Sequence, residues 1–343
     1  MADDIDQALI GRLLDYVGAG SRHAAVRLVR DLHAAGRSSE AVVHELLIPV
    51  QVEVGERWLR GEWTVAVEHE ATAIVTAALA ELGRNLPEAR RGIVVCCPEE
   101  ERHELAAHLM AKLLEGAGWK VHDLGASTPA EMLGGFAIAR DANAVLISCT
   151  TAAALPSTAR LVAAVHSAGI PVIVGGAAFG HDRSRGDAIG ADGWADSAAA
   201  ADGLLRGGTL VAGSHGSFDT AALARIGKLE AAVPLMVDIT MDHLVKQRPL
   251  AFALTGPEMD DVRESLDLLI RTAIGATVVA DDDLFTEQLD WQLDFFTYRH
   301  IPEASLTSAL GFLRDWLVDL PASGRLFGLG LEHLEALGVV AAP

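Results

Sequence analysis

The sequence predicts a multidomain protein in three parts: a four-helix bundle cap, an α/β doubly wound (flavodoxin-like) domain and a C-terminal all-α domain. Apolar residues recur at helical spacing from about residue 4 to 85, with no strand pattern. Short apolar runs then alternate with helical segments from 91 to about 205, and helical spacing alone returns from 219 to about 319. We therefore place the domains at residues 1–86, 91–207 and 217–325.

Composition limits the classes of function. Half of the 343 residues are hydrophobic, which is enough for two or three packed cores. With 27 basic and 47 acidic residues the formal net charge is −20, which repels a phosphate backbone, so we expect no direct nucleic-acid binding. No apolar run approaches the roughly 18 residues of a membrane span, and the acidic start lacks a signal-peptide pattern. We therefore expect a cytoplasmic protein with no membrane contact.

The first 86 residues carry stop and N-cap signals between their helical runs, and the short connections favour a bundle. Pro49 is tolerable in a first turn or as a kink. Trp58 is followed, after nine intervening residues, by Glu68-His69. A tryptophan ring offers a flat apolar wall, and a carboxylate accepts hydrogen bonds from hydroxyl groups. Alternatively, Trp58 is a core anchor and Glu68-His69 a solvated helix turn.

In the second domain, the run 92–98 reads as a buried strand and 104–115 as a helix, so His103 lies on a strand-to-helix crossover. Such crossovers are where α/β sheets bind ligands. A neutral imidazole is a good ligand for a transition metal, and Glu101 can accept its other N–H and fix the tautomer. The alternative is that His103 is simply a polar residue in the first helical turn.

Polar and small residues also follow two later strands of this domain. Ser148 and Thr150 end one strand, and Gly175-Gly176 end the next. Glycine pairs let another group approach the backbone closely, although such strand-end residues are common in any α/β sheet. The three cysteines, Cys96, Cys97 and Cys149, lie in apolar runs without metal-ligand spacing, so we expect buried thiols.

The segment Glu101-x-His103-x-x-Ala106 resembles the Asp-x-His-x-x-Gly signature of the cobalamin-binding domain. The resemblance implies that His103 takes the place of the dimethylbenzimidazole base beneath cobalt. It also implies that hydroxyl groups of Ser148 and Thr150 meet the displaced nucleotide base, and that Gly175 and Gly176 let the nucleotide tail pass close to the backbone.

The pattern Trp58-x9-Glu68-His69 is similar to that of the CarH-type, adenosylcobalamin-dependent photoreceptors. This resemblance implies that the helical bundle caps the upper face of the corrin and that light removes the adenosyl group. One departure is Leu59, which stands where the pattern commonly has a second histidine, so a bis-histidine photoproduct is in doubt. The chain begins at the bundle, so we expect no helix-turn-helix domain ahead of it.

A cobalamin module followed by an all-helical domain looks like the photocobilins, whose C-terminal, globin-like domain also holds biliverdin. The resemblance implies a bilin without a covalent link, because no cysteine follows Cys149. Arginines can pair with propionates, and histidine or tyrosine can meet pyrrole nitrogens or lactam oxygens. The polar residues best suited to a bilin are His243, Arg248, Tyr298, Arg299 and His300. The alternatives are solvated residues at helix ends and a domain that serves only to dimerise.

The resemblances together predict a light sensor that binds adenosylcobalamin, with cobalt on His103, and biliverdin. Loss of the adenosyl group would change domain or homo-oligomer packing and signal to an unidentified partner protein. No catalytic nucleophile or acid/base pair stands apart from the cofactor site. The main alternative is a corrinoid methyl carrier of a methyltransferase system, against which stand Trp58, Glu68-His69 and the extra C-terminal domain.

Overall fold

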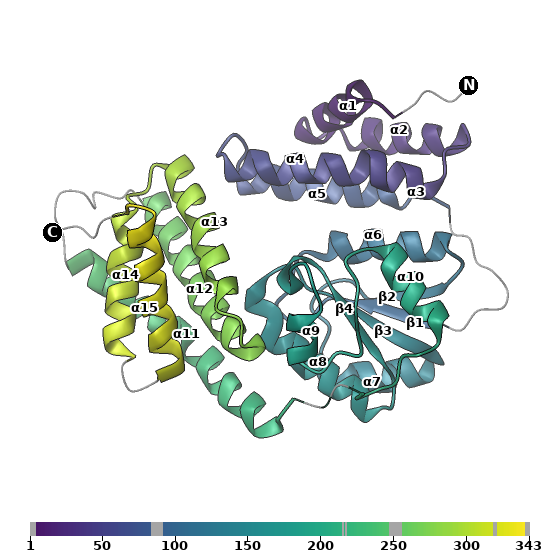
Figure 1. Cartoon of the computed structure of the whole chain (residues 1–343). Helices are drawn as coiled ribbons and strands as arrows, with labels where there is room; N and C mark the ends of the chain where they lie inside the picture. Colours follow the sequence, from purple (N-terminus) through teal and green to yellow (C-terminus); the bar gives the residue numbers. More distant parts are fainter. Residues whose placement is uncertain are drawn as a thin grey trace.

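The chain forms three parts in series. The computed structural model describes residues 5–83, 92–214, 216, 218–246, 256–317 and 321–339. The N-terminal helices lie over the α/β domain, and the C-terminal helices stand beside it (Figure 1). This arrangement confirms the predicted order of a helical cap, a parallel-sheet domain and a helical C-terminal region.

The cap is entirely helical over its described residues. Its elements are α1 (Gln7–Gly18), α2 (Arg22–Ala34), α3 (Ser39–Val42), η1 (Val43–Leu47), α4 (Ile48–Leu59) and α5 (Val65–Leu79). The run from α3 to α4 is unbroken, and η1 is a π-helical turn. Pro49, in the first turn of α4, has no N–H to bond the carbonyl four residues earlier. This missing donor explains why the helix widens just before it.

The α/β domain contains a five-stranded sheet in the order β2-β1-β3-β4-β5. All strand pairs are parallel, so the structure confirms the predicted doubly wound sheet. The strands are β1 (Gly92–Cys96), β2 (Lys120–Asp123), β3 (Ala142–Ser148), β4 (Val172–Gly175) and β5 (Gly193–Trp194). The order reverses between β1 and β3, and ligands of such sheets bind outside the carboxyl ends of the strands at that point.

Helices cover both faces of this sheet (Figure 1). The helical segments are α6 (Glu104–Gly116), α7 (Ala130–Ala139), η2 (Ala152–Ala154), α8 (Leu155–Ser167), η3 (Ala177–Phe179), α9 (Ser184–Ala188) and α10 (Ala198–Gly207). One core lies between the sheet and α6 with α10, and another between the sheet and α7 with α8. Leu105 and Leu109 of α6 also join the core of the cap. The cap therefore rests directly on α6.

The C-terminal part shares a core with the α/β domain. Its helices are α11 (Thr220–Lys246), α12 (Gly256–Val279), α13 (Asp283–Arg299), α14 (Ala304–Trp316) and α15 (Pro321–Ala336). Buried residues of these helices and of α8 belong to one continuous apolar cluster. Arg160 on α8 also forms a bidentate pair with Glu230 on α11, with N–O distances of 2.7 and 3.1 Å. The two parts are thus firmly packed together.

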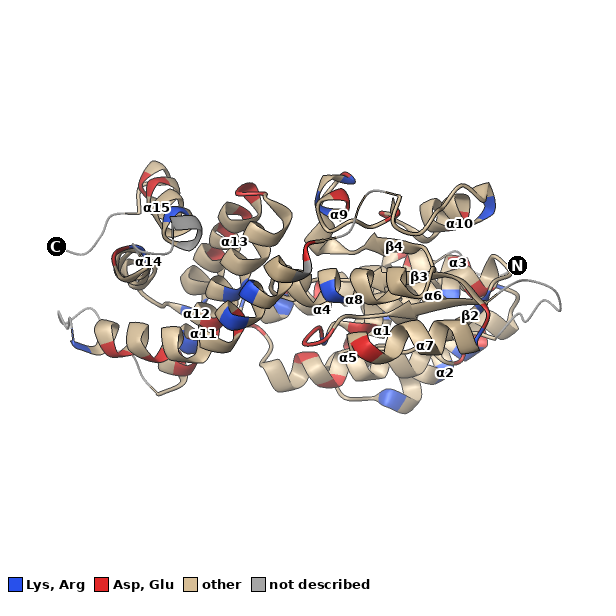
Figure 2. Cartoon of the chain, turned by 90° about the horizontal axis from the view of Figure 1, so that it is seen from below, with Lys and Arg blue, Asp and Glu red and all other residues tan. Residues whose placement is uncertain are grey.

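Helix α15 extends beyond the predicted boundary near residue 325. It continues to Ala336 because Leu326, Phe327 and Leu334 form an apolar stripe that is buried against the other helices. Within the described part of the chain, no helix is both long and apolar enough to span a membrane. Acidic residues are spread over all three parts of the chain (Figure 2).

The three cysteines are free and buried, as predicted. Burial raises the pKa of Cys97 to about 12 and raises the pKa of Cys96 and Cys149 still further. All three thiols therefore stay protonated and act as small apolar core residues.

Candidate functional site

His103 lies in the loop that follows the carboxyl end of β1, at the N-cap position of α6, and its side chain makes no capping hydrogen bond. Its imidazole is 59% exposed, and its Nδ1 lies 2.5 Å from Oε1 of Glu101. The preceding Glu100 adopts a left-handed backbone conformation, with φ of 68°, which turns the chain sharply into the helix. Because Glu101 engages Nδ1, Nε2 is the ring nitrogen left for a ligand.

Glu101 is buried, with a side chain that is 1% exposed, and its carboxylate is fully hydrogen-bonded. Oε2 accepts from the backbone N–H groups of Thr150 and Thr151, both at 2.8 Å, and from Thr151 Oγ1 at 3.1 Å. Burial alone would raise the pKa of Glu101, but the hydrogen bonds from His103 and Thr151 outweigh it and lower that pKa to about 2. The ionised carboxylate therefore ties the His103 loop to the loop after β3.

The same carboxylate acts on the electrostatics of the imidazole. The hydrogen bond that His103 donates to Glu101 raises the pKa of His103, in spite of an opposing effect of burial. A carboxylate that holds the second ring nitrogen fixes the tautomer and increases the basicity of the free nitrogen. This is the arrangement that the sequence predicts for Glu101.

Ser148 and Gly175 are paired in register at the ends of β3 and β4. Gly176 follows with φ of 100°, and a Cβ there would collide with the backbone of Cys149. A Cβ on Gly175 would likewise collide with the Ala195 carbonyl. Both glycines are therefore required by the neighbouring backbone, which is a reason for their presence independent of any ligand.

Helix α5 of the cap presents Glu68 and His69 in its first turn, after Thr64 caps the helix. Thr72 Oγ1 donates to Glu68 Oε1 at 2.9 Å, and Gln51 Nε2 donates to Thr72 Oγ1 at 2.8 Å. These bonds hold the Glu68 carboxylate in place. His69 is less enclosed, since its side chain is 74% exposed and its Nε2 lies 3.5 Å from Glu68 Oε2.

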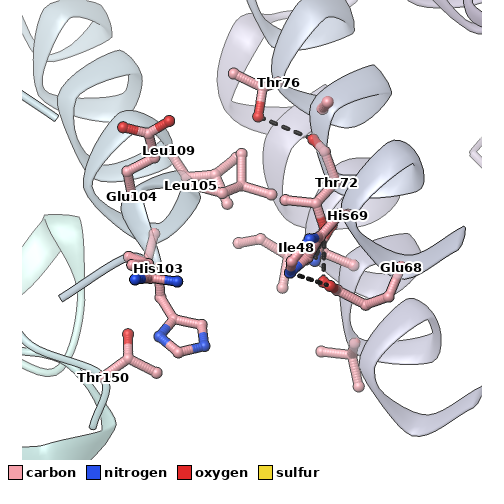
Figure 3. A pocket seen from close by; sticks show the side chains of 15 residues that line it. Ile48, Glu68, His69, Thr72, Thr76, His103, Glu104, Leu105, Leu109 and Thr150 are labelled. Carbon is pink, nitrogen blue, oxygen red and sulfur yellow. Dashed lines mark hydrogen bonds and ion pairs between the residues drawn. The ribbon is translucent and has the colours of Figure 1, made fainter. Parts of the chain in front are cut away.

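A cavity of about 470 Å³ separates the cap from the loop of His103. Figure 3 shows His103 and Thr150 on one side of it and Glu68, His69 and Thr72 on the facing helix. Leu105 and Ile48 supply part of the apolar lining. The structure thus brings residues of the two predicted constellations to opposite walls of one cavity.

Trp58 lies in the last turn of α4 and packs against the C-terminal helix α13. Its ring centroid is 6.0 Å from that of Trp291 and 5.8 Å from that of Phe295. A second cavity, of about 500 Å³, is lined by Trp58 and Trp291. Glu68, His69 and His103 line this cavity as well as the first, so the two are adjacent.

The residues predicted to meet a bilin take part in separate contacts. The ring of His243 stacks on Phe312 at 4.3 Å, and burial lowers the pKa of His243. Arg299 donates from Nη2 to the Trp58 carbonyl at 3.0 Å. Tyr298 is 45% exposed, and His300 is exposed in a left-handed conformation. Arg248 lies outside the described residues. Among the residues that the structure describes, none of these contacts joins two of the candidates to each other.

Three residues of the site had not been predicted. Thr151 binds Glu101 and directly follows the predicted Thr150. Thr72 binds Glu68 and lies one helical turn after it. Both could therefore have been found from their spacing to predicted residues. Trp291 gave no such signal, because only the docking of α13 against the cap brings it to Trp58.

The donor chemistry of this site fits a cobalt corrinoid. An exposed imidazole with one nitrogen held by a buried carboxylate is a ready axial ligand. The adjoining cavities, with apolar walls and a few fixed polar groups, are typical of cofactor sites.

Comparison with known proteins agrees with this chemistry. Residues 9–82 match one family described as "B12 binding domain", and residues 91–201 match a second family of the same description. These two segments are B12-binding domains. They imply a cobalamin cofactor, and they place His103 and Glu68 in two different B12-binding segments.

The chain is 37% identical over 143 residues to the HTH-type transcriptional repressor CarH of Myxococcus xanthus. The aligned region covers 39% of this chain and 46% of that relative. It is 30% identical over 169 residues to the repressor CarA of the same organism, covering 48% and 57%. The chain thus spans about half the length of these curated relatives. A solved structure of the Methanosarcina barkeri monomethylamine corrinoid protein is 20% identical, with a TM-score of 0.49, and covers 58% of this chain and 98% of that chain.

Proposed function

We propose that this protein is a light sensor that binds adenosylcobalamin between the cap and the α/β domain, with His103 as the lower ligand of cobalt. The proposal is based on one observation: His103 and Glu68 face each other across one cavity between two B12-binding domains. The similarity to two repressors named CarH and CarA supports the same proposal.

Each residue has a role set by its position. His103 Nε2 binds the metal, and Glu101 keeps Nδ1 protonated. Ser148 and Thr150 meet the displaced nucleotide base, and Gly175 and Gly176 border the path of the nucleotide tail. These residues act on the lower side of the corrin.

The cap residues act on the upper side. Trp58 supplies a flat wall, Glu68 accepts hydrogen bonds from ribose hydroxyl groups, and His69 lines the same face. When bound, the cofactor supplies a cobalt–carbon bond that light can break. Loss of the adenosyl group would remove its contacts with the cap, which would change the packing of domains or of a homo-oligomer and signal to a partner protein.

Helix α5 connects the site of the adenosyl group to the neighbouring helix α4. Thr72 donates a hydrogen bond to the Glu68 carboxylate, and Gln51 of α4 donates one to Thr72. A ligand that binds Glu68 therefore affects the hydrogen bonds that join α5 to α4. Leu59 occupies the position after Trp58, so His69 is the cap histidine that could reach the metal after light exposure, if the bundle moves.

We further propose that the C-terminal helices bind a linear tetrapyrrole such as biliverdin without a covalent link. The order of the domains supports this, together with the aromatic and arginine side chains at the junction of α13 with the cap. His243, Arg248, Tyr298, Arg299 and His300 remain the candidates for its polar contacts. No cysteine follows Cys149 to form a thioether.

The absorption spectrum of the purified full chain tests these proposals in one series. Adenosylcobalamin should bind stoichiometrically, and illumination should convert its spectrum irreversibly, while methylcobalamin should bind more weakly. Preference for methylcobalamin, with no lasting effect of light on the adenosyl form, would instead support a corrinoid methyl carrier. Biliverdin added with and without adenosylcobalamin should give a saturable band, and its absence rejects the bilin alone.

A further inference from the structure

An aromatic cluster joins the end of α4 to α13. It consists of Trp58, Trp291 and Phe295, which we call the junction cluster. Trp291 stacks on Trp58 with an interplanar angle of 24°, and on Phe295 at 5.6 Å with an angle of 11°. Trp58 and Trp291 are half-buried, whereas Phe295 is buried. Trp58 therefore packs against a surface made by the C-terminal helices.

Arg299 fixes this contact. Its Nη2 donates to the Trp58 carbonyl at 3.0 Å, and its guanidinium lies 5.8 Å from the Trp58 ring centroid and 5.0 Å from that of Phe295. A guanidinium over aromatic faces is attracted by their π systems. Its Nη1 also lies 4.0 Å from Oδ2 of Asp261 on α12. Arg299 thus links the cap to two helices of the C-terminal part.

One edge of this cluster borders the cofactor cavity. The cavity of about 500 Å³ is lined by Trp291 as well as by Trp58, Glu68, His69 and His103. The cavity nearer to Thr150 and Leu105 shares Glu68, His69 and His103, but is not lined by either tryptophan. A group that extends from the shared residues towards α4 therefore meets two tryptophan side chains, one from the cap and one from the C-terminal domain.

We propose that Trp291 is a binding residue for the upper ligand of the cofactor, and that Arg299 is a positioning residue that sets Trp58 beside it. This inference rests on the proposed cobalamin site. A nucleoside group is large and has a flat base, so it gains from a second aromatic wall. A methyl group is too small to reach past Glu68, and a cofactor without an upper ligand has nothing to place there. The C-terminal domain thereby contributes to the choice of upper ligand.

The test titrates adenosylcobalamin, methylcobalamin and cob(II)alamin into the full chain. Trp291→Ala should weaken adenosylcobalamin by about tenfold, the size of one lost aromatic contact, and leave the other two nearly unchanged. Trp291→Phe keeps a flat ring and should retain most of the affinity. The matched control is Trp316→Ala, because Trp316 also belongs to the C-terminal domain, is 45% exposed and lines neither cavity.

The outcomes separate the two proposals. If wild-type protein binds none of the three cobalamins, the proposed function fails. If it binds all three and Trp291→Ala weakens them equally, or weakens none, the function stands and the role of Trp291 is overturned. Should Trp291→Ala not fold, Trp291→Phe and Trp291→Leu compared with each other decide the same question through the ratio of adenosyl to methyl affinity.

A double-mutant cycle tests the role of Arg299. If Arg299 acts through Trp58, then Arg299→Ala should add little to the loss already caused by Trp58→Ala. Additive losses would mean that Arg299 acts independently. Arg299→Lys keeps the charge but not the planar fork, so it should restore only part of the affinity for adenosylcobalamin.

Discussion

Gly275 on α12 lies against the carbonyl of Ala152 in η2, with no room between them for a methyl group. η2 follows Thr150 and Thr151 directly, and the N–H groups of those residues bind Glu101. One turn before Gly275, Arg271 pairs with Glu100 in the loop of His103, with Nη1 at 3.2 Å from Oε2. Helix α12 therefore supports both loops that position His103.

We expect Gly275→Ala to lower the free energy of unfolding by about 1–3 kcal/mol, because the added methyl group overpacks against a backbone carbonyl. The matched control is Gly227→Ala on α11, where a Cβ would meet no atom within 4 Å. That change should be neutral or stabilise by up to about 1 kcal/mol. Urea unfolding of the protein without cofactor measures both. Equal effects of the two substitutions would contradict the close contact at Ala152.

His103→Ala should remove the histidine nitrogen from the cobalt of bound cob(II)alamin, since Nε2 is the free nitrogen of an imidazole anchored by Glu101. EPR of protein labelled with nitrogen-15 histidine measures this directly, because a nitrogen-15 ligand splits the cobalt signal differently from the nitrogen-14 of the cofactor's own base. His69→Ala is the control, as His69 is also exposed and lines the same cavity. Nitrogen-15 splitting that survives in labelled His103→Ala, or is missing from labelled wild type, would exclude His103 as the ligand.

Glu68→Gln should weaken adenosylcobalamin by about tenfold and methylcobalamin much less. Hydrogen bonds to a charged group contribute about 1.5–3 kcal/mol, and of the two upper ligands only the adenosyl group has hydroxyls to donate. Thr72→Val should act in the same direction with a smaller loss, since it removes the donor that holds Glu68.

Parallel spectroscopic titrations of the two cobalamins measure the Glu68 effect. Glu70→Gln serves as the control, because Glu70 is an exposed carboxylate on the same helix that lines neither cavity. Equal losses for both cofactors in Glu68→Gln would assign Glu68 a merely structural role.

The interaction of His108 with Asp123 should make the free energy of unfolding depend on pH. His108 Nδ1 lies 2.5 Å from Asp123 Oδ2, which joins α6 to the end of β2, and Glu104 lies 3.7 Å from Nε2. The hydrogen bond that His108 donates to Asp123 raises the pKa of His108, although partial burial opposes it. A raised pKa in the folded state means that the stabilisation is complete below the unfolded value of about 6.5 and is lost as the pH rises through the folded value.

The difference in free energy of unfolding between wild type and Asp123→Asn should therefore be largest below about pH 6.5 and shrink above it. Urea unfolding at several pH values measures the difference. In a His108→Gln background, Asp123→Asn should have an effect that does not vary over this range. A wild-type difference that is constant with pH would show that the pair does not titrate.

The sequence alone was sufficient for features that depend on neighbouring residues. The alternation of apolar strands with helices predicts the doubly wound sheet, because side-chain burial repeats with the period of each element. Glu101 and His103 are two residues apart, so their pairing and their position at the end of β1 are encoded in one loop. Glu68 and His69 are similarly placed by one helix turn.

Only the tertiary structure decided which of these groups line the same cavity and which helices support them. Trp58 was predicted as one side of an upper-ligand site, but its stacking partner Trp291 comes from a helix far along the chain. The contact of Gly275 with Ala152 likewise depends on how α12 docks on the sheet domain. Local periodicity records which face of a helix is apolar, and it contains no information about which distant surface that face will bury against.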